Sequence, residues 1–146
     1  MREGFNPPNV WGPRGRGFSI GLAHNEGITV HFTGQVAWDS RERIVGIGDV
    51  EAQTRQCFDN IKLVLDAVGG QMTDLVAITT YFTDRAQLPL IQAVRADYLD
   101  FGDPPVSTSV MVAGLGHEDF LVELTPIAVI PTSRFVRPGR EAGSSR

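Results

Sequence analysis

The feature that most constrains this fold is a strand that is apolar on both of its faces. It spans residues 75–83 and lies between two stretches with helical periodicity. In residues 49–68 an apolar stripe is preceded by Asp49, a good N-cap, and followed by two glycines that stop a helix. Residues 84–101 repeat the helical pattern, with Pro89 in the first turn. Two helices cover only one face of a sheet, so we expect another subunit to cover the second face.

The apolar stripes comprise Cys57, Phe58, Ile61, Val64, Leu65 and Val68 on the first helix, and Leu90, Ile91, Val94, Tyr98 and Phe101 on the second.

The remaining segments predict an α+β fold with a mixed sheet. Residues 1–16, rich in Pro, Gly and Arg, are expected to form an extended arm, and residues 38–43 a loop. Further strands are predicted at residues 18–23, 27–37, 106–113 and 120–130. The predicted order is β-β-α-β-α-β-β, with both helices on one face of the sheet. We therefore expect one domain over residues 1–130, and a mobile C-terminal tail over residues 131–146.

Composition excludes several classes of partner. The net charge is −4 and the isoelectric point is about 5.3, so there is no global basic field for nucleic acid. No apolar run approaches the roughly 20 residues of a membrane span. The single cysteine, Cys57, forms no disulfide within the chain, which favours a cytoplasmic location. We expect neither a nucleic-acid nor a membrane partner.

Few residues show a pattern typical of chemistry. The histidines His24, His31 and His117 lack metal-ligand spacing, so we expect them to be solvated or packed and expect no metal site. Cys57 lies on an apolar stripe, where a buried structural thiol is the better interpretation. The glycines and arginines of residues 12–17 do not form a phosphate loop, since no Lys-Ser or Lys-Thr follows them.

The last two strands carry the polar candidates. Strand alternation puts Ser107 and Ser109 on one face and Thr108 on the other, without an evident base beside them. Glu123 interrupts the apolar run Phe120 to Leu124. A carboxylate in such a strand either faces water at a sheet edge or faces a cavity, and composition alone leaves both alternatives open.

Several segments, taken in order, resemble the RidA (reactive-intermediate deaminase, or YjgF) family. They are residues 32–36, 53–56, 60–61, 64–67, 81–84, 94–101, 121–124 and 127–129. No single segment is specific, but their order and spacing cover residues 9–130. The resemblance implies a fold similar to chorismate mutase, with three subunits packing their sheets into a central barrel. It also implies that small molecules bind in clefts between the subunits.

The resemblance also implies a chemistry. Deaminating members hydrolyse reactive enamines and imines to 2-keto acids and ammonia without a cofactor. A glutamate on the last strand holds the attacking water, and Glu123 falls on this position. Thr33 and Gly34 fall on residues whose backbone lines the pocket, and Phe18 falls on a pocket tyrosine. Tyr98 and Thr108 are assigned by the same resemblance to substrate binding.

One departure from the family concerns the arginine on the fifth strand that binds the substrate carboxylate. Ser107 occupies this position, and it cannot form a bidentate ionic fork. Losing such a bond in a desolvated site costs on the order of 2–5 kcal/mol. We therefore expect weak deamination of 2-imino acids. Arg95, at a helix position where the deaminases carry an asparagine near the cleft, is either a replacement cation or a solvated helix arginine.

Two functions remain open from the sequence. The first is an enzyme that hydrolyses a small imine, enamine or related C–N bond, with Glu123 positioning water. The second is a non-catalytic trimer whose clefts bind a small metabolite. A third activity ascribed to some relatives, cleavage of RNA or inhibition of translation, is disfavoured by the acidic composition.

Overall fold

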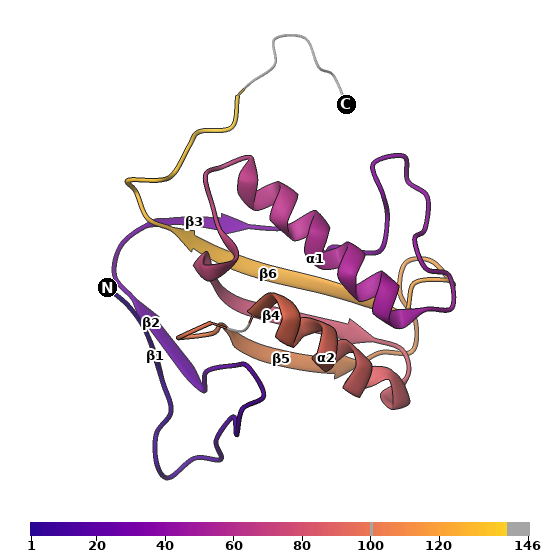
Figure 1. The fold of residues 1–146 in the computed structure, drawn as a ribbon, viewed down its shortest axis with the longest axis horizontal. Coiled ribbons are helices and arrows are strands. Elements are labelled where there is room, and N and C mark those ends of the chain that lie inside the picture. Colours follow the sequence, from indigo (N-terminus) through magenta and orange to yellow (C-terminus); the bar gives the residue numbers. More distant parts are fainter. Residues whose placement is uncertain (100, 140–146) are drawn as a thin grey trace.

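The computed structural model describes residues 1–99 and 101–139 of the chain. Two helices lie on one face of a four-stranded sheet, and a two-stranded hairpin lies beside it (Figure 1). The elements are β1 Arg2–Phe5, β2 Gly21–His24, β3 Ile28–His31, α1 Val50–Asp66, η1 Met72–Asp74, β4 Leu75–Phe82, η2 Arg85–Gln87, α2 Leu88–Leu99, β5 Val106–Met111 and β6 Val122–Ile130. The expected α+β class, with two helices on one face of a mixed sheet, is confirmed.

The main sheet has the strand order β3-β6-β4-β5, so β6 and β4 are its inner strands. The β4–β5 pair is parallel, since α2 provides the crossover between these strands, and the other pairs are antiparallel. The prediction was incomplete at the N-terminus, because part of the arm forms strand β1, which pairs with β2 outside the main sheet. Arg2 ties β1 to the body by donating hydrogen bonds to the carbonyl oxygens of Asp103 and Leu75.

Helix α1 begins and ends as its sequence predicts. The Asp49 carboxylate accepts the Ala52 N–H at 3.1 Å, and Gly69, at φ +74°, ends the helical stretch. One face of the helix is buried, through Val50, Gln53, Thr54, Cys57, Phe58, Ile61 and Leu65. Val64 was expected on this stripe but is 37 % exposed, because it lies at the edge of the buried face.

Helix α2 buries most of the expected face, since Ile91 and Val94 are buried and Tyr98 and Phe101 pack, partly buried, against the core. Its buried residues are Ile91, Val94, Arg95 and Leu99, whereas Leu90 is 43 % exposed. The 3₁₀ turn η2 precedes the helix, so the regular turns begin only at Leu88.

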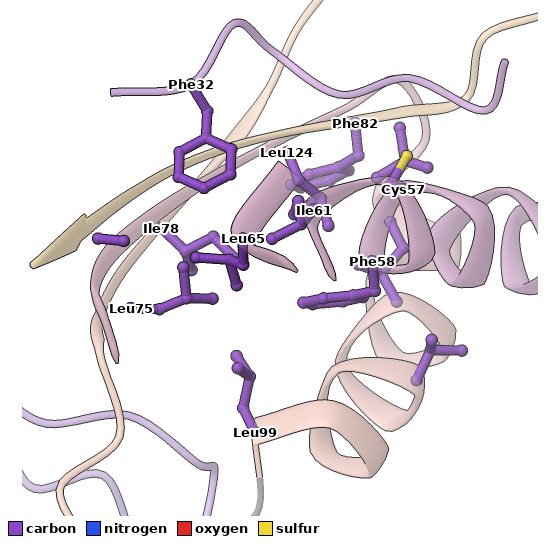
Figure 2. Packing of buried hydrophobic residues seen from close by; sticks show 14 of the residues in the cluster. Phe32, Cys57, Phe58, Ile61, Leu65, Leu75, Ile78, Phe82, Leu99 and Leu124 are labelled. Carbon is purple, nitrogen blue, oxygen red and sulfur yellow. The ribbon is translucent and has the colours of Figure 1, made fainter. Parts of the chain in front are cut away.

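The core fills the space between the helices and the sheet (Figure 2). Phe58 of α1 stacks on Tyr98 of α2, with ring centroids 4.6 Å apart, and this contact joins the two helices. From the sheet, Ile78, Val122 and Leu124 point into the same cluster and are almost completely buried. Burial of these side chains is the main stabilising term of the fold.

The opposite face of the sheet is not covered by helices. Its side chains form rows across the strands: His31, Ile127, Ala77 and Val106; then Thr125, Thr79 and Thr108; then Glu123, Tyr81 and Val110. None of these residues is fully buried. The argument that two helices leave one sheet face open therefore holds for this structure.

The segment that follows β6 makes specific contacts with the body. Arg134 forms an ion pair with the buried Asp74, at 2.6 Å, and also donates to the carbonyl oxygen of Gly69. The Val136 N–H donates to the carbonyl of Val68. The first part of the segment that was predicted to be a mobile tail is therefore bound to the body of the protein. The last part, residues 140–146, lies outside the described residues.

The attachment of this segment makes Gly69 sensitive to substitution. A Cβ at Gly69 would collide with the Arg134 carbonyl oxygen, whereas Gly48, at a nearly identical φ of +75°, has open space around it. We expect Gly48→Ala to lower the free energy of unfolding by about 1–2 kcal/mol through left-handed backbone strain alone. Gly69→Ala should cost clearly more. Equal losses in urea denaturation would show that the Arg134 contact does not constrain this position.

The thiol of Cys57 provides a test of core burial. Burial raises its pKa from 9.0 to about 12, and the Glu123 carboxylate adds to this rise. Because the folded thiol keeps its proton while the unfolded thiol loses it, stability falls as pH rises above 9.0. Relative to Cys57→Ala, the wild type should lose up to about 1.4 kcal/mol per pH unit there. Parallel stability curves for the two proteins from pH 8 to 10.5 would contradict this burial.

Candidate functional site

Three of the residues predicted for the site line one cavity, of about 430 Å³: Thr33, Gly34 and Glu123. The other lining residues are Gln35, Val36, Trp38, Asn60, Gly116, His117 and Phe120. We call this cavity the Glu123 pocket. It lies where the segment after β3 passes the beginning of β6, so residues far apart in the sequence meet there.

A bulge next to β6 brings Thr33 and Gly34 to the pocket. β3 pairs with β6 up to His31 opposite Ile127, and pairing resumes at Gln35 opposite Leu124. Three residues of one segment therefore face two of the other, which is the pattern of a β-bulge. Pro126 is one of these two residues, and its lack of an N–H suits the interrupted ladder.

Glu123 reaches the pocket by strand alternation. Its neighbours Val122 and Leu124 are buried in the core, so Glu123 points to the open face of the sheet. Its carboxyl group lies directly over Gly34, where a Cβ would be only 2.8 Å from the Glu123 Cδ and Oε2 atoms. Glycine at position 34 therefore leaves the space that this carboxylate occupies.

Aromatic rings form one wall of the pocket. Trp38 and Phe120 meet edge to face, with centroids 5.3 Å apart, and the His117 ring lies 5.5 Å from Phe120. Asn60 of α1 fixes the segment that carries Trp38, because its amide donates to the carbonyl oxygens of both Val36 and Trp38.

Sequence reasoning missed His117 as a pocket residue. Its Nδ1 accepts the backbone N–H of Asp119 at 3.0 Å, so the neutral ring carries its proton on Nε2. His117 has no metal-ligand spacing in the sequence, and its turn gives no periodic signal. Only the contact between the turn and the pocket identifies it.

Gln53 was also missed, although it organises the same turn. Its fully buried side chain accepts the Leu121 N–H and donates to the carbonyl oxygens of Asp119 and Gly46. A polar residue inside the apolar stripe of a helix is uncommon, and this position of Gln53 in the sequence could have identified it as a structural residue. Gln53 thus holds the approach to β6, on which His117 and Glu123 depend for their positions.

Ser107 and Glu123 are not brought together within one chain. Ser107 lies beside the buried Ile78 and faces the helices, whereas Glu123 lies beside Tyr81 on the open face. Strand β4 lies between β5 and β6, and the two residues are offset by three positions along the strands. Their Cα atoms are therefore about 14 Å apart. The resemblance assigns both residues to a cleft between subunits, and inside a single chain they do not share a pocket.

Arg95 is neither solvated nor near Glu123. It is 4 % exposed, and its guanidinium donates to the Ser107 hydroxyl at 2.7 Å. Burial lowers its pKa. The Ser107 hydroxyl is therefore bound by Arg95 of the same chain, on the helix-covered side of the sheet.

The other predicted residues are dispersed. Tyr98 donates to the Asp59 carboxylate at 3.0 Å and packs between the helices, away from the pocket. Thr108 is exposed on the open face of β5. Phe18 belongs to the loop between β1 and β2, where Trp11 packs edge to face against it and the Arg16 guanidinium lies 5.7 Å from its ring.

The described residues contain no cluster of three His, Cys, Asp or Glu side chains that could bind a metal ion. Among the same residues, no helix combines the length and the apolar character that a membrane span requires.

Comparison with known proteins identifies the family of this chain and supports its fold. The family described as Endoribonuclease L-PSP matches residues 17–130. A RutC family protein from Pyrococcus horikoshii is 32 % identical over 124 residues, which cover 84 % of this chain and 91 % of that protein.

Two solved structures are similar as well. A protein of the Rid family, YyfB from Yersinia pestis, has a TM-score of 0.83 at 31 % identity, covering 88 % of this chain and 98 % of the other. RidA from an Antarctic Psychrobacter has a TM-score of 0.65 at 29 % identity, covering 73 % and 85 % respectively. The match over residues 17–130 shows that this chain belongs to the Endoribonuclease L-PSP family, the family of RidA and YjgF.

Proposed function

We propose that the protein hydrolyses the C=N bond of a small imine, or of an enamine after its tautomerisation, in the Glu123 pocket. The observation that carries the proposal is the carboxylate of Glu123 over Gly34, in a cavity large enough for a small metabolite. Such a carboxylate can hold a water molecule beside a bound substrate. Family membership supports a role that involves small molecules of this type.

The reaction needs only groups that this chain supplies. The imine reacts in its protonated form: Glu123 accepts a proton from water as the water oxygen bonds to the imine carbon, and the π electrons of C=N move to nitrogen. The resulting neutral carbinolamine receives a proton on nitrogen from Glu123. The C–N bond then breaks as the hydroxyl proton passes to Glu123, ammonia leaves with the bonding electrons, and the carbon keeps a carbonyl oxygen. The departing ammonia takes up that proton as ammonium, which restores the carboxylate. Glu123 acts as base in the first step and returns the proton in the second. No cofactor takes part.

A second copy of the chain would complete the site. Phe18 lies away from the Glu123 pocket of its own chain, so it could line the pocket only from a neighbouring subunit. The uncovered sheet face is the natural contact between copies, since apolar side chains such as Ile127 and Val110 remain accessible there. We therefore propose a homotrimer, with Thr108 at the edge of the shared cleft, and a cytoplasmic location.

The alternative is a trimer that binds a metabolite without converting it. The bound Ser107 hydroxyl favours this candidate, because no free charged group stands at the family's carboxylate-binding position. RNA cleavage receives less support. The chain carries a net charge of −4, and the Glu123 pocket contains no lysine or arginine among its described lining residues.

Glu123→Gln tests the enzymatic proposal. The amide keeps the size of the side chain but cannot accept a proton, so hydrolysis should fall by about 10²- to 10⁴-fold. The substrates would be 2-iminobutanoate, made by a threonine dehydratase, and the imine made from butan-2-amine by an amine oxidase, each followed by competition with semicarbazide. Glu118→Gln, at an exposed neighbouring carboxylate, should leave the rate unchanged. Wild-type protein that accelerates neither reaction would favour the binding alternative.

The homotrimer is tested separately, by sedimentation equilibrium at micromolar concentration. We expect a single species of three times the 15.9 kDa chain mass. Thr79→Arg, in the middle row of the open sheet face, should shift this species to monomer, since three like charges would meet at the interface. Thr73→Arg, at an exposed position outside the sheet, should leave the trimer intact. A wild-type monomer would contradict the shared cleft.

A further inference from the structure

We infer that the Glu123 pocket recognises a cationic nitrogen, an iminium or ammonium group on a small apolar skeleton without a carboxylate. The inference deepens the proposed function by naming its substrate class. Only the claim that the bound cation is hydrolysed rests on that function. Recognition of the cation rests on the pocket itself.

The first support is the aromatic wall. Trp38, Phe120 and His117 all line the cavity, and their rings meet at interplanar angles of 77° and 53°. The Phe120 ring is 4 % exposed and supports the wall from behind, whereas Trp38 is 41 % exposed and offers most of the accessible tryptophan and phenylalanine surface. A cation within about 6 Å of an aromatic face is attracted by the ring quadrupole, most strongly by tryptophan.

The second support is the charge balance of the pocket. Among its described lining residues, Glu123 is the one carboxylate, and there is no lysine or arginine. The Nδ1 of His117 already accepts the Asp119 N–H. An anionic ligand would meet the Glu123 carboxylate without a counter-charge from this chain, which is costly in a partly desolvated site. A cation would be attracted by the carboxylate and by the rings together.

The third support is the position of Arg95. It could balance a substrate carboxylate only if it faced the pocket. Instead it is buried on the helix-covered side of the sheet and is bound to Ser107. The Glu123 pocket therefore has a carboxylate and an aromatic wall, but no arginine of this chain that could bind a carboxylate of the ligand.

This arrangement suits the chemistry of imine hydrolysis. The protonated C=N group is planar and electrophilic, so it can lie against a ring while Glu123 directs water to its carbon. A substrate of this class arises when a primary or cyclic amine is oxidised to an imine. The inference therefore puts the protein downstream of an amine-oxidising reaction, instead of one that releases imines from amino acids.

The binding test uses two probes that cannot be hydrolysed, benzylammonium and phenylacetate, in calorimetric titrations of the full chain. We expect benzylammonium to bind at least roughly ten-fold more tightly than phenylacetate. Trp38→Leu and Glu123→Gln should each weaken benzylammonium binding several-fold, and Trp38→Tyr should retain most of it because a ring remains. Phe5→Leu and Glu118→Gln, at exposed positions outside the pocket, are the matched controls.

The outcomes separate this inference from the proposed function. Tighter binding of phenylacetate, binding of neither probe, or full benzylammonium affinity in Trp38→Leu would each overturn the inference. If benzylammonium binds as expected but the butan-2-amine-derived imine is not hydrolysed, the enzymatic proposal fails and cation recognition stands. If 2-iminobutanoate is hydrolysed faster than the imine without a carboxylate, hydrolysis stands and the substrate class is wrong.

Discussion

The alternation of side chains along β6 is the constraint on which the rest of the structure depends. Val122 and Leu124 are buried against the helices, so Glu123, between them, must point to the other face. A shift of one residue would bury the carboxylate in the core and expose two large apolar side chains. The core therefore fixes the register, and the register fixes the position of the carboxylate. Strand β6 therefore determines both the packing of the core against the helices and the position of the Glu123 carboxylate.

Pro126 links this strand to the pocket. A proline in an inner strand removes one backbone donor, and the structure accommodates it where the ladder to β3 is interrupted. The resulting bulge carries Thr33 and Gly34 past Glu123, and Gly34 leaves room for the carboxylate. On the other side, Gln53 fixes the backbone before β6 with two hydrogen bonds, to Asp119 and Leu121, and ties it to the carbonyl of Gly46 with a third. Backbone irregularities on both sides of a regular strand thus create the cavity.

The predictable parts of the fold were those with a local, periodic signal. The stripe of α1, its Asp49 cap and the outward direction of Glu123 follow from spacing and alternation. Strand β1 was missed because its four residues are stabilised by distant partners, such as the carbonyl of Leu75 that accepts from Arg2. His117 was missed for the same reason. Its role depends on a turn that meets the pocket in space, and no local pattern reports such a contact.

The pair of Arg95 and Ser107 limits the positive charge that the chain offers to a ligand. A serine at position 107 is short enough for a helix arginine to bind it, and the pair is buried together. The arginine then satisfies a structural hydroxyl and does not face the pocket. What remains at the Glu123 pocket is a negative charge beside aromatic rings, with no fixed positive charge among the described lining residues. Electrostatic complementarity selects the ligand whose charge is opposite to that of the site. If the proposed function holds, the absence of a cationic group from this end of the cleft would favour a cationic ligand, while the Glu123 carboxylate stays in place to hold water.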